Sequence, residues 1–337
     1  MITTIIMLLI LSFLGFILVY RDSKGKDSSF FDIQTSECMR GFWCLIVLLV
    51  HIPLEQQNTI QDAIGSFAFI GVTFFFMTSS YGLTLSALKK PESYLHGFWT
   101  KRLSRLMLPM LFVNVFTILA EVITIKEFDF WQLFRLTGWV RQILFFYLMF
   151  WLLHKFLPSK LDVKSKSLIV ILVTCVFSLF VYITKGMGVF GWPTETMGFI
   201  YGILLALFKD KFQRFALNKW LIKTITALIL SAVLGVAYLC FKTIPVIGDY
   251  ILKIFLGAAI LSLIFIANSK ISIGNPVSRF LGSISYEIYL FHSVAFILLE
   301  AFSSQLESGV YVLLSMLITI VLSYVVNRLC SLIMKKR

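Results

Sequence analysis

The sequence predicts an all-α polytopic membrane protein with about eleven transmembrane helices, a ten-span core preceded by one N-terminal span. Three observations support this prediction. Of the 337 residues, 59% are hydrophobic and only 14% are charged, whereas a soluble domain has about 25% charged residues. Long apolar stretches recur along the chain, and positive charges collect in alternate loops between them. A chain this apolar could not cover its surface with polar groups in water, so most of its solvent must be lipid.

Each expected span is a stretch of about 20 apolar residues, the length that crosses the hydrocarbon core. The stretches are continuously apolar rather than alternating, which favours helices over a β-barrel. The seventh is short and the second is marginal. We expect spans at residues 2–20, 38–54, 63–85, 104–125, 139–156, 167–184, 194–208, 220–241, 250–268, 284–300 and 309–331.

The N-terminal stretch 2–20 has the length of a signal peptide but lacks its other features. No positive charge precedes it, and no small-x-small cleavage site follows it. We therefore expect a retained span, which joins the core 38–331 in a single domain over residues 1–337.

The loop charges predict an orientation. Of the 30 Lys and Arg residues, 24 fall in loops on one side of the predicted spans and six on the other. The positive-inside rule then places the N-terminus outside and the C-terminus in the cytoplasm. The same rule accounts for the net charge of +13, so no nucleic-acid partner is expected. The five cysteines have no metal-ligand spacing, and neither a metal site nor a disulfide framework is expected.

Two titratable residues share the second predicted span. Arg40 and His51 are eleven positions apart, so they project from one helix face about 16 Å apart along the axis. His51 suits a general base, because its unperturbed pKa is near neutrality. Arg40 suits an anionic group that arrives from the cytoplasm, or a structural carboxylate partner. Taken singly, a histidine at a helix end is more often structural, and an arginine there is more often a membrane anchor.

The tenth predicted span carries a second histidine. His292 follows "SISYEIYLF" at about 13 Å from the inner end of its span, close to the expected depth of His51. It could share a site with His51 or satisfy a polar network. Glu287 lies nearer the inner surface, where we expect a structural role.

A basic run stands at the inner mouth of the fourth predicted span. In "FWTKRLSRLMLP", Lys101 and Arg105 are four apart and face one side of a helix, with Arg102 beside them. These residues could clamp the phosphates of a nucleotide-bearing donor. Positive-inside anchoring is the alternative explanation.

Three further polar residues are candidates for a pocket. Ser79 and Tyr81 lie within the apolar stretch "FFFMTSSYGL", where small hydroxyl residues more often serve helix packing. Glu195 stands beside a proline at the start of the short seventh span. It suggests an outward-facing acceptor site, although loop structure is an equally simple explanation.

Four segments together resemble the acyltransferase-three family, membrane enzymes that acylate surface glycans. "RGFWCLIVLLVH" is similar to the family's Arg-x10-His signature, and "FFMTSSY" to its Phe-Phe-x-x-Ser-Gly-aromatic stretch. "KRLSRLMLP" resembles a basic run of the family, and "LGSISYEIYLFH" a late Ser-Tyr-x-x-Tyr-Leu-x-His motif. Ser80 stands in place of the family glycine, which would crowd a close helix contact or alter a pocket. The family core begins with the Arg-x10-His helix, so residues 2–20 would be an extra span.

The resemblance implies a plasma-membrane O-acyltransferase. Its donor would be cytoplasmic acyl-CoA, usually acetyl-CoA, with no tightly bound cofactor. Its acceptor would be a hydroxyl of a cell-surface or lipid-linked polysaccharide presented outside. Membrane lipid and polysaccharide-biosynthesis proteins would be further partners. His51 would be the catalytic residue, either as a base or as an acylated nucleophile. Ser79, Tyr81 and His292 would be candidates for stabilising the oxyanion.

Two other classes of function compete with this interpretation. A transporter or flippase for a glycan or lipid would have the same spans and would use the same midplane polar residues. A non-catalytic subunit of a polysaccharide export complex would not need His51. An acyltransferase that uses CoA needs inner basic residues together with a base at mid-depth, and this sequence has both.

Overall fold

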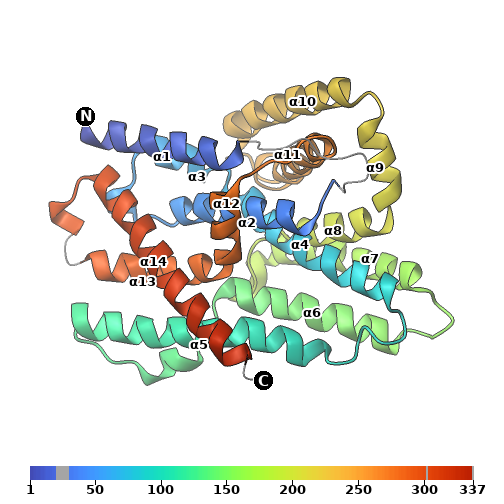
Figure 1. The fold of residues 1–337 in the computed structure, drawn as a ribbon, viewed down its shortest axis with the longest axis horizontal. Helices are drawn as coiled ribbons and strands as arrows, with labels where there is room; N and C mark the ends of the chain where they lie inside the picture. The colour runs from blue at the N-terminus through green and yellow to red at the C-terminus, as the bar shows by residue number, and fades with distance from the viewer. Residues whose placement is uncertain (20–29, 301–302, 336–337) are drawn as a thin grey trace.

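In a computed structural model, the described residues 1–19, 30–300 and 303–335 form helices and connecting loops without any β-strand (Figure 1). The first seven α-helices are α1 (Ile2–Leu18), α2 (Ile33–Val50), α3 (Thr59–Gly65), α4 (Ala68–Lys89), α5 (Phe98–Thr124), α6 (Gly138–Phe156) and α7 (Val163–Thr184). The next seven are α8 (Met197–Leu207), α9 (Lys209–Leu217), α10 (Trp220–Phe241), α11 (Lys253–Asn268), α12 (Pro276–Ser283), α13 (Ser285–Glu300) and α14 (Ser308–Lys335).

Five short helical turns complete the secondary structure of the described residues. They are η1 (Leu54–Gln56), η2 (Phe130–Phe134), η3 (Lys185–Gly188), η4 (Ile247–Leu252) and η5 (Ser303–Gln305), of which η4 is a π-helix. The all-α class predicted from the sequence is therefore confirmed.

The predicted number of spans is not confirmed. Over the described residues, eight helical segments are long and apolar enough to cross a membrane, and a ninth results if α12 and α13 are one bent span. The predicted spans 2–20 and 194–208 correspond to the shorter helices α1 and α8, of 17 and 11 residues. A helix rises 1.5 Å per residue, so α8 is only about 17 Å long against the roughly 30 Å of a hydrocarbon core.

Helix α2 begins and ends earlier than the predicted span 38–54. It begins at Ile33 because Asp32 caps it, with the Asp32 carboxylate accepting a hydrogen bond from the backbone N–H of Thr35 at 2.7 Å. It ends at Val50, three residues before Pro53, whose ring disfavours helical backbone in the residue before it. His51 is consequently the capping residue at the C-terminal end of α2 rather than a residue within the helix.

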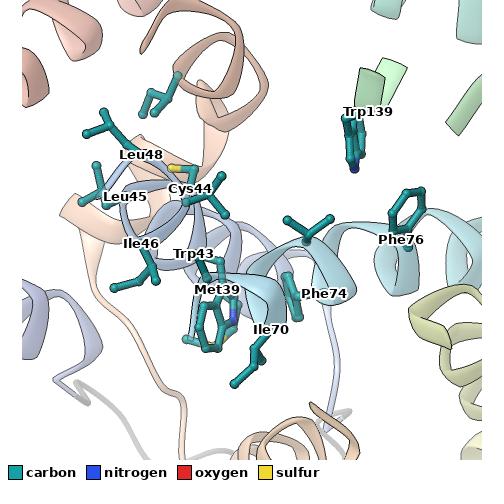
Figure 2. Packing of buried hydrophobic residues seen from close by; sticks show 14 of the residues in the cluster. Met39, Trp43, Cys44, Leu45, Ile46, Leu48, Ile70, Phe74, Phe76 and Trp139 are labelled. Carbon is teal, nitrogen blue, oxygen red and sulfur yellow. The ribbon is translucent and has the colours of Figure 1, made fainter. Parts of the chain in front are cut away.

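The core forms where α2 packs against α4 and α12. Figure 2 shows Met39, Trp43 and Leu45 of α2 among this cluster, with Ile70 and Phe74 of α4 beside them. All five side chains are buried. These large apolar side chains pack closely against one another. This packing fixes the position of α2, the helix that carries both Arg40 and His51.

The residue that replaces the family glycine has a specific neighbour. Ser80 of α4 is fully buried, and a Cβ added to Gly202 of α8 would lie 2.0 Å from the Ser80 Oγ. A Cβ added to Gly198, one turn earlier, would lie equally close to the Thr73 carbonyl oxygen. Helices α4 and α8 therefore approach closely because the glycines stand on α8, and they leave room for the serine on α4.

The bend between α12 and α13 brings the late motif to α2. Asn275 caps α12 through hydrogen bonds from the N–H groups of Val277 and Ser278, and Pro276 takes the first helical position. The two helices meet at an angle of 72°. Helix α13 then packs against α2, α5 and α14. This packing brings its polar residues Glu287 and His292 close to α2, the helix that carries Arg40 and His51.

Candidate active site

His51 and His292 lie face to face. Their ring centroids are 4.9 Å apart and the rings are 17° from parallel. His51 is exposed at the end of α2, whereas His292 of α13 is half-buried. The His292 Nδ1 is buried near the carbonyl oxygens of Ile288 and Tyr289 without a well-formed hydrogen bond to them. The structure thus brings together the two histidines that the sequence places at similar depths.

A path of rings leads from the histidine pair into the protein. The Tyr289 ring is 5.9 Å from His292 and 5.5 Å from Trp139. Tyr286, one turn before Tyr289 on α13, has its ring 6.2 Å from the same tryptophan. The rings of Tyr286, Tyr289 and His292 stand at i, i+3 and i+6, which places them along one face of α13.

The rings of Tyr286, Tyr289 and Trp139 border a cavity of about 340 Å³, which we call the aromatic cavity. Arg40 and Arg105 bring positive charge to it, while Ser79 and Glu287 bring polar groups. The remaining lining residues are Phe75, Thr78, Leu106, Pro109, Trp139, Ser283, Ser285, Tyr286, Tyr289, Asn327 and Met334. Neither histidine lines this cavity, which ends at Tyr289 and Trp139, one ring short of His292.

A larger cavity of about 950 Å³ adjoins the aromatic cavity, and we call it the basic cavity. The two share Arg40, Thr78, Ser79 and Arg105. The basic cavity lies at the N-terminal end of α2, and its other lining residues are Phe31, Asp32, Ile33, Gln34, Ser36, Tyr81, Gly82, Leu85, Lys89 and Lys209. His51 lies at the opposite end of α2, which is about 27 Å long.

Arg40 has two acidic neighbours, Glu37 on α2 and Glu287 on α13. Glu287 is buried in the same cavity wall and interacts electrostatically with Arg40. The Glu287 carboxylate accepts a 3.0 Å hydrogen bond from the side-chain amide of Asn327. The Arg40 Nε is buried without a hydrogen-bond partner. Arg40 therefore has both the carboxylate neighbour and the open cavity that its position suggests.

The basic run of α5 divides between cavities. Arg105 lines the aromatic and basic cavities, whereas Lys101 and Arg102 line a third cavity of about 510 Å³, together with Lys89 and His96. The Arg102 guanidinium lies 3.9 Å from the centre of the Phe98 ring, and its Nη1 donates to the Phe98 carbonyl oxygen at 3.2 Å. Lys101 and Arg102 thus line a different cavity from Arg105. Lys89 lines both the basic and the third cavity, which places the two side by side.

The remaining polar candidates fall in different places. Ser79 and Tyr81 line the basic cavity, and the Ser79 hydroxyl donates to the Phe75 carbonyl oxygen at 3.0 Å. Glu195 is buried just before α8, where it accepts a 2.8 Å hydrogen bond from the Thr194 hydroxyl. It also interacts electrostatically with Tyr238 of α10, so its partners lie away from the histidine pair. Among the described residues, no group of three metal-ligating side chains is found.

The structure adds site residues that sequence reasoning passed over. Tyr289 and Trp139 separate the aromatic cavity from the histidines, and Lys89 and Lys209 add charge to the basic cavity. The i, i+3, i+6 spacing of Tyr286, Tyr289 and His292 in the sequence could have identified Tyr289. Nothing in the sequence pattern singles out Lys209 among the many inner-loop lysines.

The fold and the buried polar groups define a multi-pass membrane protein with a titratable site in its interior. The chain belongs to the acyltransferase-three family, because the family model described as an acyltransferase domain matches residues 33–328. No curated protein and no solved structure matches the chain. The match begins at Ile33, the first residue of α2, and leaves α1 before it. The protein is therefore a membrane acyltransferase.

Proposed function

We propose that the protein transfers an acyl group, expected to be acetyl, from cytoplasmic acyl-CoA to a hydroxyl of a cell-surface or lipid-linked polysaccharide. One observation carries the proposal. The histidine pair stands at one end of α2 and the basic cavity at the other, and the aromatic cavity with its ring path lies between them. A donor and an acceptor could thus approach from opposite faces of a membrane and meet along α2.

In this proposal the phosphates of the donor occupy the basic cavity. Arg40, Arg105, Lys89 and Lys209 supply four positive charges there, opposed by Asp32 of the α2 cap. Arginine offers forked N–H donors that match phosphate oxygens, and lysine adds a compact charge. The adjacent third cavity adds Lys101 and Arg102, which could receive a further phosphate of the same donor.

The acyl arm of the donor then occupies the aromatic cavity. Its charged residues, Arg40, Arg105 and Glu287, share the wall with the rings of Trp139, Tyr286 and Tyr289, which suit the uncharged part of the arm. Rotation of the Tyr289 ring would open the remaining step to His292 and His51. Such a movement is small, because only one ring separates the cavity from the histidine pair.

His51 is the proposed catalytic base because it is the exposed member of the pair. Its neutral imidazole accepts the proton of the acceptor hydroxyl as that oxygen attacks the thioester carbonyl carbon. The tetrahedral intermediate collapses, the carbon–sulfur bond breaks, and the thiolate takes up the proton from the imidazolium. His292, stacked on His51, holds the base in position and lies close enough to interact with the oxyanion.

The decisive experiment compares surface glycans from cells that carry the wild-type protein, His51→Ala, or no protein. Mass analysis should show glycans that are heavier by the mass of one acyl group only in the cells that carry the wild-type protein. The same experiment separates the rival classes. A flippase would change the amount of glycan at the surface without changing its mass. A non-catalytic subunit would leave acylation intact in the His51→Ala cells, and this result would overturn the proposal.

A further inference from the structure

An apolar groove separate from the site above lies between α8 and α11. Its volume is about 310 Å³, and we call it the α8–α11 groove. Phe212 of α9 completes its wall, and α9 lies between α8 and α10 in the chain (Figure 1). The lining residues are Tyr201, Leu204, Leu205, Phe208, Phe212, Ala258, Leu261, Ser262 and Phe265. Only the Tyr201 and Ser262 side chains bring polar groups, so water is a poor occupant.

The groove has a closed end and a side open to the membrane. At the closed end, the Tyr201 hydroxyl donates to the Ile254 carbonyl oxygen of α11 at 3.0 Å. Leu204 is exposed along the length of the groove. From Tyr201 to Phe208 the groove extends about 10 Å along α8, comparable with the roughly 15 Å depth of one leaflet's hydrocarbon layer. A hydrocarbon chain that lies parallel to α8 would match these dimensions.

The end of the groove at Phe208 is positively charged. The ammonium groups of Lys164 and Lys211 each lie 5.6 Å from the centre of the Phe208 ring. Both lysines are exposed, so neither charge is neutralised by burial in a salt bridge. They belong to the face of the protein that carries most of the Lys and Arg residues.

Two carboxylates lie near these lysines, but both have other neighbours. Asp162 caps α7 and accepts a hydrogen bond from the Ser165 N–H at 2.9 Å. The hydrogen bonds from Ser165 and the charge of Lys164 lower the pKa of Asp162, so it stays ionised. Asp210 interacts electrostatically with Tyr81, which lines the basic cavity. The carboxylates therefore reduce the positive charge beside Phe208 without cancelling the two exposed ammonium groups.

We propose that the α8–α11 groove binds one acyl chain of an anionic phospholipid, whose phosphate lies between Lys164 and Lys211. Charge complementarity and depth argue for this ligand. The apolar length of the groove ends where the two ammonium groups begin, which is the arrangement of a lipid tail and its headgroup. The site stands apart from the proposed acyl transfer and does not depend on it.

The test measures lipid retained by the purified full-length protein. Native mass spectrometry in detergent would count bound dioleoyl phosphatidylglycerol and, in parallel, dioleoyl phosphatidylcholine. We expect the wild-type protein to retain phosphatidylglycerol in preference. The variant Lys164→Ala/Lys211→Ala should lose that preference. Lys155→Ala/Lys160→Ala removes two exposed positive charges from the end of α6 and the loop before α7 and serves as the matched control.

A second pair of variants tests the apolar part. Ala258→Leu fills the groove and should lower retention of both lipids several-fold, whereas Ala232→Leu on the exposed surface of α10 should not. If Ala258→Leu does not fold, Ser262→Val tests the same space. Equal retention by the groove variants and their controls would overturn the proposal. So would displacement of phosphatidylglycerol by acetyl-CoA, which would assign the groove to the donor.

Discussion

The imidazole of His51 lies against that of His292, with ring centroids 4.9 Å apart, although 241 positions separate them in the chain. The rings stack through their faces, so the nitrogens of the exposed His51 lie at the edge of the stack, whereas the His292 Nδ1 is buried. The pair joins the end of α2 to the middle of α13, the two helices that carry the longest motifs of the family resemblance.

Replacement of the two histidines should have unequal effects. His51→Ala should lower acyl transfer by about 10²- to 10⁴-fold, the usual contribution of a general base. His292→Ala should cost about tenfold through misplacement of His51, and His292→Phe, which keeps a flat ring, should cost less. Turnover of the purified protein would be measured with a glycan acceptor. Binding of the acyl-CoA donor by each variant would show that the variant is folded. Normal turnover by His51→Ala would exclude the proposed mechanism.

Loss of an arginine shared by the two cavities should weaken donor binding. Arg105→Ala and Arg40→Ala each remove charge-assisted hydrogen bonds worth about 1.5–3 kcal/mol, so the KM for acyl-CoA should rise roughly ten- to a hundredfold. Arg102→Ala should raise it less, because its guanidinium already packs on Phe98. The control Lys155→Ala changes the same charge outside the three cavities. An unchanged KM with reduced expression would show that these arginines are membrane anchors.

The ring at the end of the aromatic cavity should protect the donor from water. Tyr289→Phe keeps the ring and should retain activity within a few-fold. Tyr289→Ala should let water reach the thioester, so that the free thiol is released from acetyl-CoA in the absence of any acceptor. A thiol assay without glycan measures this uncoupled hydrolysis. Equal, low hydrolysis by both variants would mean that another group closes the cavity.

The close approach of α4 and α8 should make Gly202 intolerant of a side chain. Gly202→Ala should destabilise the protein by about 1–3 kcal/mol, since its Cβ would meet the Ser80 Oγ and the backbone of α4. Gly235→Ala on α10 is the matched control, because its Cβ would meet nothing within 4 Å. Thermal unfolding in detergent would compare them. Adding Ser80→Gly should restore part of the loss, and its failure to do so would locate the clash in the backbone.

The sequence predicted much of the fold and about half of the site. A long apolar stretch reliably predicts a helix in a membrane protein, and each of the eleven predicted stretches contains a helix. Depth along a helix follows from its fixed rise per residue, which is how the meeting of His51 and His292 could be anticipated. Helix ends were less predictable, because the start of α2 depends on the local Asp32 cap.

The rest of the site depends on which helices are neighbours. Periodicity places Lys101 and Arg105 on one helix face, but it does not show that the boundary between two cavities passes between them. Nor could the position of Trp139 beside Tyr289 be inferred, since it follows from the packing of α13 near α6 after a 72° bend. Glu195 was selected because it stands at the start of the short seventh span, and there its carboxylate accepts a hydrogen bond from Thr194.

The closure of the aromatic cavity at Tyr289 and Trp139 has a consequence for the cell. An enzyme that joins reactants from two faces of a membrane must not become a pore, because each ion or proton that leaks through it dissipates the transmembrane potential. Under the proposed function, the Tyr289 ring between the aromatic cavity and His292 would let a short acyl group pass by a side-chain movement and would otherwise interrupt a column of water. Such catalysis would need no large alternation between inward-open and outward-open states, and it would leave the electrical insulation of the membrane intact during each turnover.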